Sequence, residues 1–243
     1  MNTLLIGNGY WGNIIKPKLE KLTNLIGVVD SKTDINSFLG DKIDFAFVCT
    51  PTNTHYKISK ILIENNINIF CEKPFTGDIN LANELYKMSV DKNTIIYVDN
   101  IFLLRDEIKN IEFCSIEKLE FLWKKNDNNY KENLINSLMY HDLYLTNYLI
   151  KKNSWVFEKI DYNEKNLDVV MNNDQSEVRF IYDRGSDLKE KIIIVNDTTK
   201  IDISNPKNDP LNDTIIKIIN KEIDYESNKI ITLETLELIQ KIK

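Results

Sequence analysis

Two side chains in this sequence, Lys73 and His141, are of types that exchange protons and stabilise charge on oxygen. Lys73 lies in the segment CEKPFT, directly after an apolar run of strand length, and Pro74 fixes the chain direction behind it. An ammonium at a strand end polarises a carbonyl or holds an alkoxide. His141 is one of two histidines, and an imidazole pKa of about 6.5 suits general acid–base catalysis. These residue types predict chemistry at a hydroxyl or ketone carbon. The alternatives are a solvated lysine and a core histidine.

A glycine-rich turn near the start of the chain has the spacing of a dinucleotide-binding site. In GNGYWG, Gly7, Gly9 and Gly12 follow a strand-like run and open a helical pattern. The first glycine permits a tight turn, the second lets the backbone approach a pyrophosphate, and the third lets helix and strand pack closely. The N–H groups of the helix start then bind the anion. We therefore predict a pyrophosphate site, against the alternative of a tight turn without a ligand.

An acidic residue follows at the expected distance. Asp30 ends the second strand-like run, eighteen residues after Gly12, where a carboxylate binds a ribose hydroxyl. A carboxylate repels a 2′-phosphate, so Asp30 favours NAD(H). Ser31 and Lys32 follow it and would bind that phosphate if Asp30 turned away, so NADP(H) is not excluded. FAD uses the same opening fingerprint but gives the CEKPFT segment no role.

The elements that position these residues alternate over the first hundred residues. Five apolar runs of strand length are nearly continuous, which is typical of a parallel sheet buried on both faces. Three stretches between them carry apolar residues at helical spacing. The runs cover 3–7, 25–30, 43–50, 67–72 and 94–99, and the helical stretches cover 10–22, 54–65 and 80–90. This order predicts an α/β fold over residues 1–102, a doubly wound parallel Rossmann sheet.

The rhythm changes after Asn100, and we predict a second, α+β domain over residues 103–243. Runs such as SEVRFIYD and EKIIIVND, separated by turn-rich segments, predict an antiparallel meander between 155 and 203. Two helices that begin near Pro210 and Thr232 close the chain. The open face of this largely antiparallel sheet would expose apolar residues, so we expect a homodimer or higher homo-oligomer through that face.

Two further strand ends, FVCTPTNTHY at 47–56 and CEKPFT at 71–76, carry distinctive sequence. Together with GNGYWG and VVD, in this order, they resemble the Gfo/Idh/MocA family of NAD(P)-dependent sugar and nucleotide-sugar oxidoreductases. The resemblance covers residues 1–100, returns in MYHDLYLTNYL at 139–149, and is faint in the last helices. It implies that Lys73 lies beside the nicotinamide and the reacting carbon, and that His141 lines the substrate pocket.

One position departs from the family pattern. The family commonly has an aspartate four residues before this histidine, where this chain has Ser137. Helical spacing puts Ser137 and His141 on one face, so the serine is able to bind substrate but does not titrate near neutral pH. His141 is then the best acid or base. Tyr144 stands where related sequences often have another acid, and Asp142 is expected to orient a neighbour.

The predicted site residues fall into three groups. The catalytic residues are Lys73 and His141. Cofactor contacts are predicted at Gly7, Gly9, Tyr10, Trp11, Gly12, Asp30, Ser31, Thr50, Pro51, Asn53, His55, Glu72, Lys73 and Asn100, with a structural role also expected for His55. Substrate contacts are predicted at Lys73, Asn100, Ser137, His141 and Tyr144. No metal site is predicted, because Cys49, Cys71 and Cys114 lack CxxC spacing and a histidine cluster and are interpreted as buried, reduced thiols.

The function implied is hydride transfer between nicotinamide and a hydroxyl or ketone carbon of a sugar. The resemblance favours a nucleotide-linked sugar in surface-glycan biosynthesis. Two alternatives stay open: a noncatalytic dinucleotide-binding regulator or subunit, motivated by Ser137, and a reductase of a nonsugar carbonyl or imine.

The composition excludes some partners. With 37 acidic and 31 basic residues, the net charge of −6 and the absence of a basic stripe argue against nucleic acid. The start of the sequence lacks signal-peptide features, and no apolar stretch approaches the roughly 20 residues that span a bilayer. We expect a cytoplasmic protein that does not bind membranes.

Overall fold

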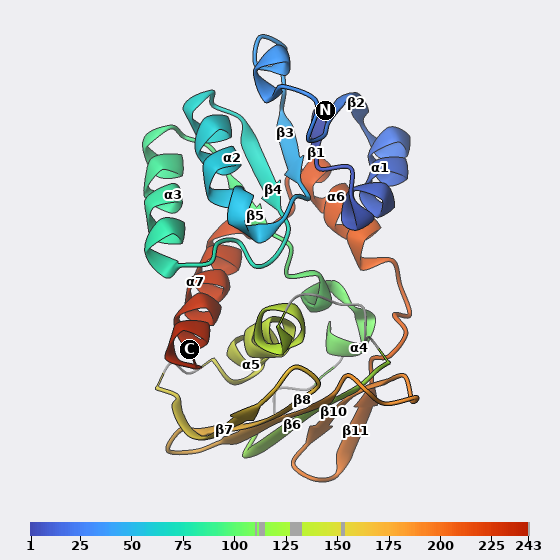
Figure 1. Cartoon of the computed structure of the whole chain (residues 1–243), viewed down its shortest axis with the longest axis vertical. Coiled ribbons are helices and arrows are strands. Elements are labelled where there is room, and N and C mark those ends of the chain that lie inside the picture. The colour runs from blue at the N-terminus through green and yellow to red at the C-terminus, as the bar shows by residue number, and fades with distance from the viewer. Residues whose placement is uncertain (110, 112–114, 127–132, 152–153, 243) are drawn as a thin grey trace. The chain divides into compact units, whose positions relative to one another are not determined.

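The computed structural model describes residues 1–109, 111, 115–126, 133–151 and 154–242, so Cys114 lies outside the described residues. The chain divides into two compact units (Figure 1). Unit 1 comprises Met1–Ile101 and Leu211–Leu236, and unit 2 comprises Phe102–Pro210 and Glu237–Lys243. The division after residue 101 lies next to the predicted boundary. Residues 211–236 differ from the prediction, because they group with the first unit.

Unit 1 is built on a parallel sheet of five strands in the order β2-β1-β3-β4-β5. The strands are β1 (Asn2–Ile6), β2 (Asn24–Val29), β3 (Phe45–Val48), β4 (Asn68–Cys71) and β5 (Ile96–Val98). All four neighbouring pairs are parallel. Strands β1, β3 and β4 are almost wholly buried, which explains their continuous apolar sequence. The predicted Rossmann sheet is confirmed.

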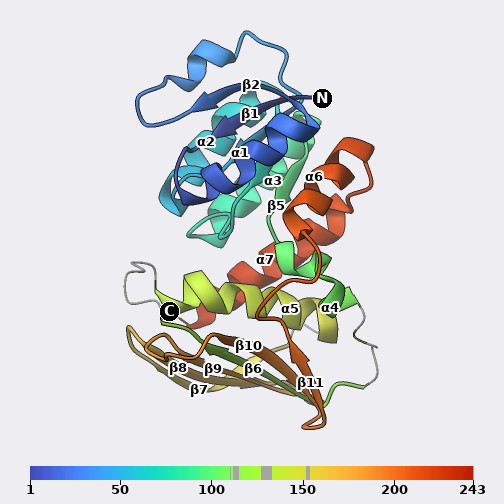
Figure 2. The same cartoon turned by 90° about the vertical axis from the view of Figure 1, so that its right-hand side faces the viewer.

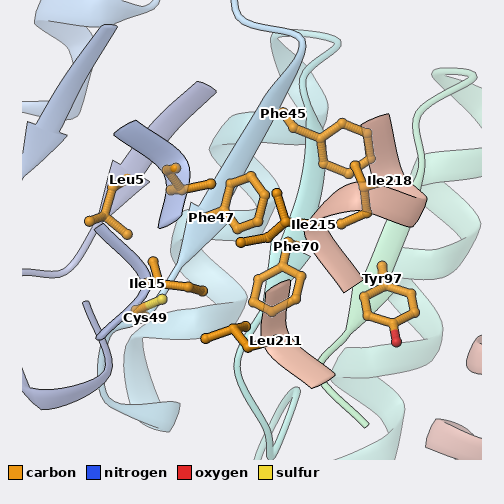
Figure 3. Close-up of a cluster of buried hydrophobic side chains, with 11 residues drawn as sticks. Leu5, Ile15, Phe45, Phe47, Cys49, Phe70, Tyr97, Leu211, Ile215 and Ile218 are labelled. Atoms are coloured by element: carbon orange, nitrogen blue, oxygen red, sulfur yellow. The ribbon is translucent and has the colours of Figure 1, made fainter. Parts of the chain in front are cut away.

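Helices cover both faces of this sheet (Figure 1). Helix α1 (Tyr10–Leu22) and helix α6 (Pro210–Asn220) lie on one face, and α2 (Thr52–Glu64) and α3 (Ile79–Asp91) lie on the other. A 3-10 helix, η1 (Ile35–Phe38), lies between β2 and β3. Figure 3 shows α6 contributing Leu211, Ile215 and Ile218 to a core cluster with the aromatic side chains of the sheet. This apolar packing is why residues near 211–220 belong to unit 1.

The last helix, α7 (Tyr225–Ile242), closes the β5 edge of the sheet. The Asn228 side chain accepts a hydrogen bond from the Val98 N–H at 2.8 Å and donates one to the Val98 carbonyl at 2.9 Å, so it replaces a neighbouring strand. Helix α7 begins seven residues before the predicted start near Thr232. The Asp224 side chain accepts hydrogen bonds from the N–H and hydroxyl of Ser227, a cap that the sequence prediction missed.

Unit 2 contains a six-stranded sheet in the order β11-β10-β6-β9-β8-β7. The strands are β6 (Lys118–Lys124), β7 (Val156–Tyr162), β8 (Asn166–Asn172), β9 (Glu177–Asp183), β10 (Glu190–Val195) and β11 (Thr199–Asp202). The open, largely antiparallel sheet is confirmed. The predicted continuous meander is wrong in one respect: β6 lies between β9 and β10 and pairs in parallel with β9. This pairing joins segments far apart in sequence, which local periodicity does not reveal.

Short helices and one long helix complete unit 2. They are η2 (Ile101–Leu104), α4 (Asp106–Lys109), a π-helical turn η3 (Ile135–Met139) and α5 (Tyr140–Ile150). Figure 2 shows α5 lying over one face of the sheet. Alternate residues of β8 and β9 are buried beneath it, including Val169 and Phe180. In the described part of unit 2, the opposite sheet face carries no helix.

Candidate functional site

A cleft of about 690 Å³ lies at the carboxyl ends of β1, β2 and β3 in unit 1. The chain adds β2 on one side of β1 and adds β3, β4 and β5 on the other side, so the strand order reverses between β1 and β3. Doubly wound sheets bind ligands at the point where the strand order reverses. The lining residues are Ile6, Gly7, Asn8, Gly9, Val29, Asp30, Ser31, Thr33, Asp34, Ile35, Cys49, Thr50, Pro51, Thr54 and Ile58. The predicted cofactor residues among them are Gly7, Gly9, Asp30, Ser31, Thr50 and Pro51. The remaining predicted cofactor residues lie outside this lining.

The glycine turn leaves room for a ligand beside Gly9, where the sequence predicts that the backbone approaches a pyrophosphate. Gly7 has a φ of +107°, and a Cβ there would lie 2.5 Å from the Cys49 carbonyl oxygen. A Cβ at Gly12 would lie 1.9 Å from the Gly7 carbonyl oxygen, so helix α1 packs directly on the turn. A Cβ at Gly9 would meet nothing within 4 Å. The turn is therefore closed by backbone on two sides and open beside Gly9, which fits a pyrophosphate.

Helix α1 begins at the mouth of this turn. Its first intrahelical bond runs from the Asn13 N–H to the Gly9 carbonyl at 2.9 Å. The N–H groups of Tyr10, Trp11 and Gly12 precede that bond and lack acceptors within the helix. The Tyr10 side chain is 76% exposed and Trp11 is 38% exposed. A cofactor contact through Tyr10 and Trp11 stays a prediction. Their backbone N–H groups are the donors that such a contact would use.

The segment after β2 contributes two carboxylates to the cleft lining. Asp30 Oδ1 accepts hydrogen bonds from the Lys32 N–H and the Thr33 hydroxyl, each at 2.9 Å. These bonds hold the pKa of Asp30 below its usual value, so the group is ionised at neutral pH. Asp34, which also lines the cleft, is held by hydrogen bonds from Asn36. Asp34 is a lining residue that the sequence prediction missed.

His55 lies between two predicted site segments. Its Nε2 lies 2.7 Å from the Thr50 carbonyl and its Nδ1 lies 3.0 Å from the Pro74 carbonyl. The ring is 1% exposed, and burial lowers its pKa. His55 thus links the loop after β3 to the loop after β4. This arrangement supports the structural role, and a direct cofactor contact through His55 stays a prediction, as does one through Asn53.

Lys73 follows β4, at the same edge of the sheet as the cleft. It is partly buried, and its peptide bond to Pro74 is cis. Glu72 and Asp99, the residues that follow β4 and β5, are 6% and 3% exposed. Burial and the charge of Glu72 raise the pKa of Asp99 well above its usual value, and Lys73 opposes the shift. Asp99 is a buried titratable group near Lys73 that the predicted site residues did not include.

Asn100 has a different environment from the one predicted for it. Its side chain is fully buried, and Nδ2 donates to the Thr232 hydroxyl of α7 at 3.3 Å. The side chain therefore connects the end of β5 to the last helix. Its predicted contacts with nicotinamide and substrate stay predictions that would require this side chain to turn.

In unit 2, His141 is held by aromatic neighbours. Its ring stacks on Phe102 with centroids 4.3 Å apart and planes 17° apart. Its Nδ1 lies 3.1 Å from the Tyr144 hydroxyl, which also accepts a hydrogen bond from the Phe102 N–H at 3.0 Å. His141 is 8% exposed and Tyr144 is fully buried. Tyr144 thus fixes the imidazole, and its predicted substrate contact stays a prediction.

Ser137 lies in the π-helical turn that precedes α5. Its hydroxyl donates to the Asn133 carbonyl at 2.7 Å and accepts a hydrogen bond from Arg184 at 2.8 Å. The prediction assumed regular α-helical spacing between Ser137 and His141. A π-helical turn contains an extra residue, so these two side chains do not lie as directly above one another as assumed. Arg184, 6% exposed, is a neighbour of this position that the sequence did not reveal.

Asp142 organises a buried ion pair beside the histidine. Its Oδ1 lies 3.0 Å from Lys191 Nζ, and its Oδ2 accepts a hydrogen bond from the Tyr182 hydroxyl at 2.7 Å. Lys191 Nζ also lies 4.1 Å from the Phe102 ring centroid and 3.7 Å from that of Trp123. Asp142 therefore orients a neighbour, as expected. The partner Lys191 could not be predicted, because β10 lies about fifty residues further along the chain.

Unit 1 thus holds the cleft and Lys73, and unit 2 holds His141, Ser137 and Tyr144. Among the residues that the structure describes, no group of three or more His, Cys, Asp or Glu side chains is arranged to hold a metal ion. The buried thiols of Cys49 and Cys71 have pKa values raised well above their usual range, chiefly by burial. Within the described ranges, no helix is both long and apolar enough to cross a membrane.

The glycine turn, the helix start and the ribose-side carboxylate define a dinucleotide-binding Rossmann fold. Residues 6–100 match the Gfo/Idh/MocA family, described as an oxidoreductase family with an NAD-binding Rossmann fold. Over these residues, the resemblance to that family and the NAD-binding Rossmann domain predicted from the sequence are confirmed.

Individual relatives extend the likeness. UDP-N-acetylglucosamine 3-dehydrogenase from Acidithiobacillus ferrooxidans is 23% identical over 167 residues, 60% of this chain and 53% of that protein, so the match spans about half of the relative. A solved structure of UDP-N-acetylglucosamine 3-dehydrogenase from that organism has a TM-score of 0.86 at 17% identity, covering 100% of this chain and 96% of that one. The WlbA (WbpB) dehydrogenase from Thermus thermophilus, in complex with NAD and UDP-GlcNAcA, has a TM-score of 0.84 at 12% identity, covering 98% and 93%. The structural likenesses show the fold.

Proposed function

We propose that this chain transfers a hydride between nicotinamide and a hydroxyl or ketone carbon of a sugar, and that the sugar is nucleotide-linked. The observation that carries the proposal is the position of Lys73, at the carboxyl end of β4 and at the same sheet edge as the dinucleotide cleft. The names of the two dehydrogenases above support a nucleotide-linked sugar. A role in surface-glycan biosynthesis is part of the proposal.

The residues divide the chemistry as follows. A bound nicotinamide dinucleotide supplies or accepts the hydride. The Lys73 ammonium donates a hydrogen bond to the substrate oxygen and stabilises the negative charge that develops there during reduction. His141 exchanges the proton of that oxygen, with Lys73 as the alternative donor. Because Tyr144 engages Nδ1 of His141, the exchange uses Nε2. Oxidation is the reverse sequence.

NAD(H) is the proposed cofactor, with NADP(H) as the alternative to test. Asp30 and Asp34 both line the cleft, and the hydrogen bonds to Asp30 hold it ionised. Two carboxylates at the ribose side repel a 2′-phosphate. Lys32, two residues after Asp30, is the cation that would favour NADP(H).

The open face of the unit 2 sheet supports the proposed homo-oligomer. Partly buried apolar residues on this face, including Leu122 and Ile181, lie beside charged side chains of β8 and β9. Arg179 makes two hydrogen bonds of 3.0 Å to Asp168 there, which holds the pKa of Asp168 at about 2. A second copy is the proposed cover for this face, because the mixture of apolar and fixed charged groups suits a specific interface.

A panel of nucleotide sugars, assayed by nicotinamide absorbance with both cofactors, tests the function. Lys73→Met and His141→Asn are each expected to lower turnover by about 10²–10⁴-fold while leaving NAD affinity in calorimetry nearly unchanged. Lys87→Met, an exposed lysine on α3, is the matched control and should keep full activity. The regulator alternative, favoured by Ser137 in place of an acid, predicts NAD binding with no turnover of any substrate. Turnover that survives both substitutions refutes the assignment.

A further inference from the structure

Two carboxylic acids lie side by side at neighbouring strand ends in unit 1. Cys71 of β4 and Val98 of β5 are partners in the parallel ladder, and Glu72 and Asp99 follow them directly. The Asp99 N–H donates to the Cys71 carbonyl at 2.9 Å, so the ladder continues past the strands. Register partners on parallel strands point to the same face of a sheet. The carboxyl groups of Glu72 and Asp99 are therefore neighbours. Glu72 also directly precedes Lys73 in the sequence.

Burial makes two negative charges at this place costly. Glu72 is 6% exposed and Asp99 is 3% exposed. Among the described residues, Asp99 Oδ1 has no hydrogen-bond partner, although the atom is fully buried. An ionised carboxylate in such a position would be strongly penalised, whereas a carboxyl group that carries a proton is penalised far less.

The other titratable groups around Asp99 are neutral at pH 7. Burial and the nearby carboxyl groups raise the pKa of the thiols of Cys49 and Cys71 well above the usual value. Burial and Asp99 likewise raise the pKa of the Tyr97 phenol. Burial lowers the pKa of His55, whose ring binds the Pro74 carbonyl. The charge balance of the cluster therefore depends on two carboxyl groups and one ammonium.

We propose that Glu72 and Asp99 share one proton, and that the single remaining negative charge keeps Lys73 as an ammonium ion. With one proton shared, the cluster carries one negative and one positive charge and is neutral overall. With none shared it would carry a net charge of −1 in a buried setting. Asp99 is then a positioning residue that acts through Lys73. This inference rests on the proposed function for the role of that ammonium, but the shared proton itself does not.

Charge arithmetic separates three variants. Asp99→Asn resembles the protonated form and leaves Glu72 ionised, so the net charge of the pair stays at −1. In Glu72→Gln the repulsion is gone, Asp99 ionises, and the pair again carries −1. The double variant carries no charge, so Lys73 loses its counter-ion and its ammonium is destabilised.

Carbon-13 NMR of labelled aspartate carboxyl groups tests the shared proton in the whole chain without substrate. The Asp99 signal is assigned by its loss in Asp99→Asn. In the wild type it is expected to titrate well above the ordinary aspartate range, and in Glu72→Gln its midpoint should fall by more than about one pH unit. Glu64→Gln, at the exposed end of α2, is the control and should not move it. An Asp99 that titrates near pH 4 in the wild type, or that ignores Glu72→Gln, overturns the proposal.

Carbon-13 NMR of the lysine Cε groups tests the link to Lys73, with assignment by Lys73→Met. The midpoint of Lys73 should fall by more than about one pH unit in the double variant and by less in either single variant. An unchanged midpoint in the double variant overturns the link.

Turnover is measured separately. If the NMR results are as expected but no nucleotide sugar reacts, the proposed function fails while the shared proton stands. If turnover is present and the titrations are ordinary, only the shared proton fails.

Discussion

Replacing Lys191 with methionine is expected to destabilise unit 2 by about 3–5 kcal/mol, because it leaves the Asp142 carboxylate buried without its cation. The side chains of Lys191 and Asp142 are 6% and 0% exposed, and their charged atoms lie 3.0 Å apart. Methionine keeps most of the volume of lysine against the rings of Phe102 and Trp123. The loss is therefore mainly electrostatic, with the Tyr182 hydroxyl as the remaining donor to Asp142.

The pH dependence of this variant has a definite sign. Burial raises the pKa of Asp142, and Lys191 is the largest opposing influence. Removing Lys191 raises the pKa of folded Asp142 further, so the folded state keeps a proton that the unfolded state releases. Below the ordinary aspartate pKa of about 4, the carboxyl is protonated in both states and the ionisation penalty vanishes. The penalty grows as the pH rises through the interval between the two pKa values. The defect of Lys191→Met should thus be larger at about pH 8 than at about pH 5.

Urea unfolding followed by tryptophan fluorescence measures the effect, because Trp123 lies against Lys191 and reports on unit 2. The double variant Asp142→Asn with Lys191→Met removes both charges and should recover to within about 1–2 kcal/mol of the wild type. Lys159→Met breaks an exposed ion pair with Asp168 on the same sheet and should cost no more than about 1 kcal/mol. A Lys191→Met cost as small as that control, or one independent of pH, would refute a buried ionised pair.

Two further substitutions test the fold around the cleft. Gly12→Ala places a Cβ 1.9 Å from the Gly7 carbonyl oxygen, so NAD affinity measured by calorimetry should fall by more than about tenfold. Gly77→Ala is the control, because a Cβ at Gly77 meets nothing within 4 Å, and this variant should bind NAD normally. Asn228→Leu leaves the Val98 N–H without its acceptor, whereas the Val98 carbonyl keeps the Asn100 N–H as a donor at 2.7 Å. The free energy of unfolding in urea should fall by about 1–3 kcal/mol, and a change below about 0.5 kcal/mol would contradict the closure of the β5 edge by α7.

The sequence predicted the parts of the site that depend on local signals. Gly7 and Gly12 occupy backbone positions where a Cβ would collide with a carbonyl oxygen, so their spacing alone identifies the turn. Strands β1, β3, β4 and β5 of unit 1 are short and almost wholly buried, and continuous apolar runs mark them. Asp30 follows such a run directly. Each of these signals lies within a few residues of the feature that it predicts.

The rest of the site depends on pairings that local sequence does not contain. Asp99 becomes a neighbour of Glu72 only because β4 and β5 pair in a particular register. Lys191 of β10 meets Asp142 of α5 about fifty residues away in sequence, beside its ladder partner Trp123 of β6. The π-helical turn around Ser137 adds a residue to the helix. The sequence of this turn contains no glycine or proline, so no local sequence signal predicts it.

The buried charges of unit 2 also bear on whether the chain is an enzyme or a regulator. A regulator needs the dinucleotide cleft, which lies wholly in unit 1. An ion pair such as Asp142 with Lys191 contributes less to stability than apolar packing of the same volume, so fold stability is a weak reason for its presence. Lys191 lies 4.1 Å from the ring centroid of Phe102, and His141 stacks on that ring at 4.3 Å. The ion pair therefore fixes the surface against which the imidazole is held. A precisely held imidazole is suited to proton exchange, so this arrangement favours the enzyme.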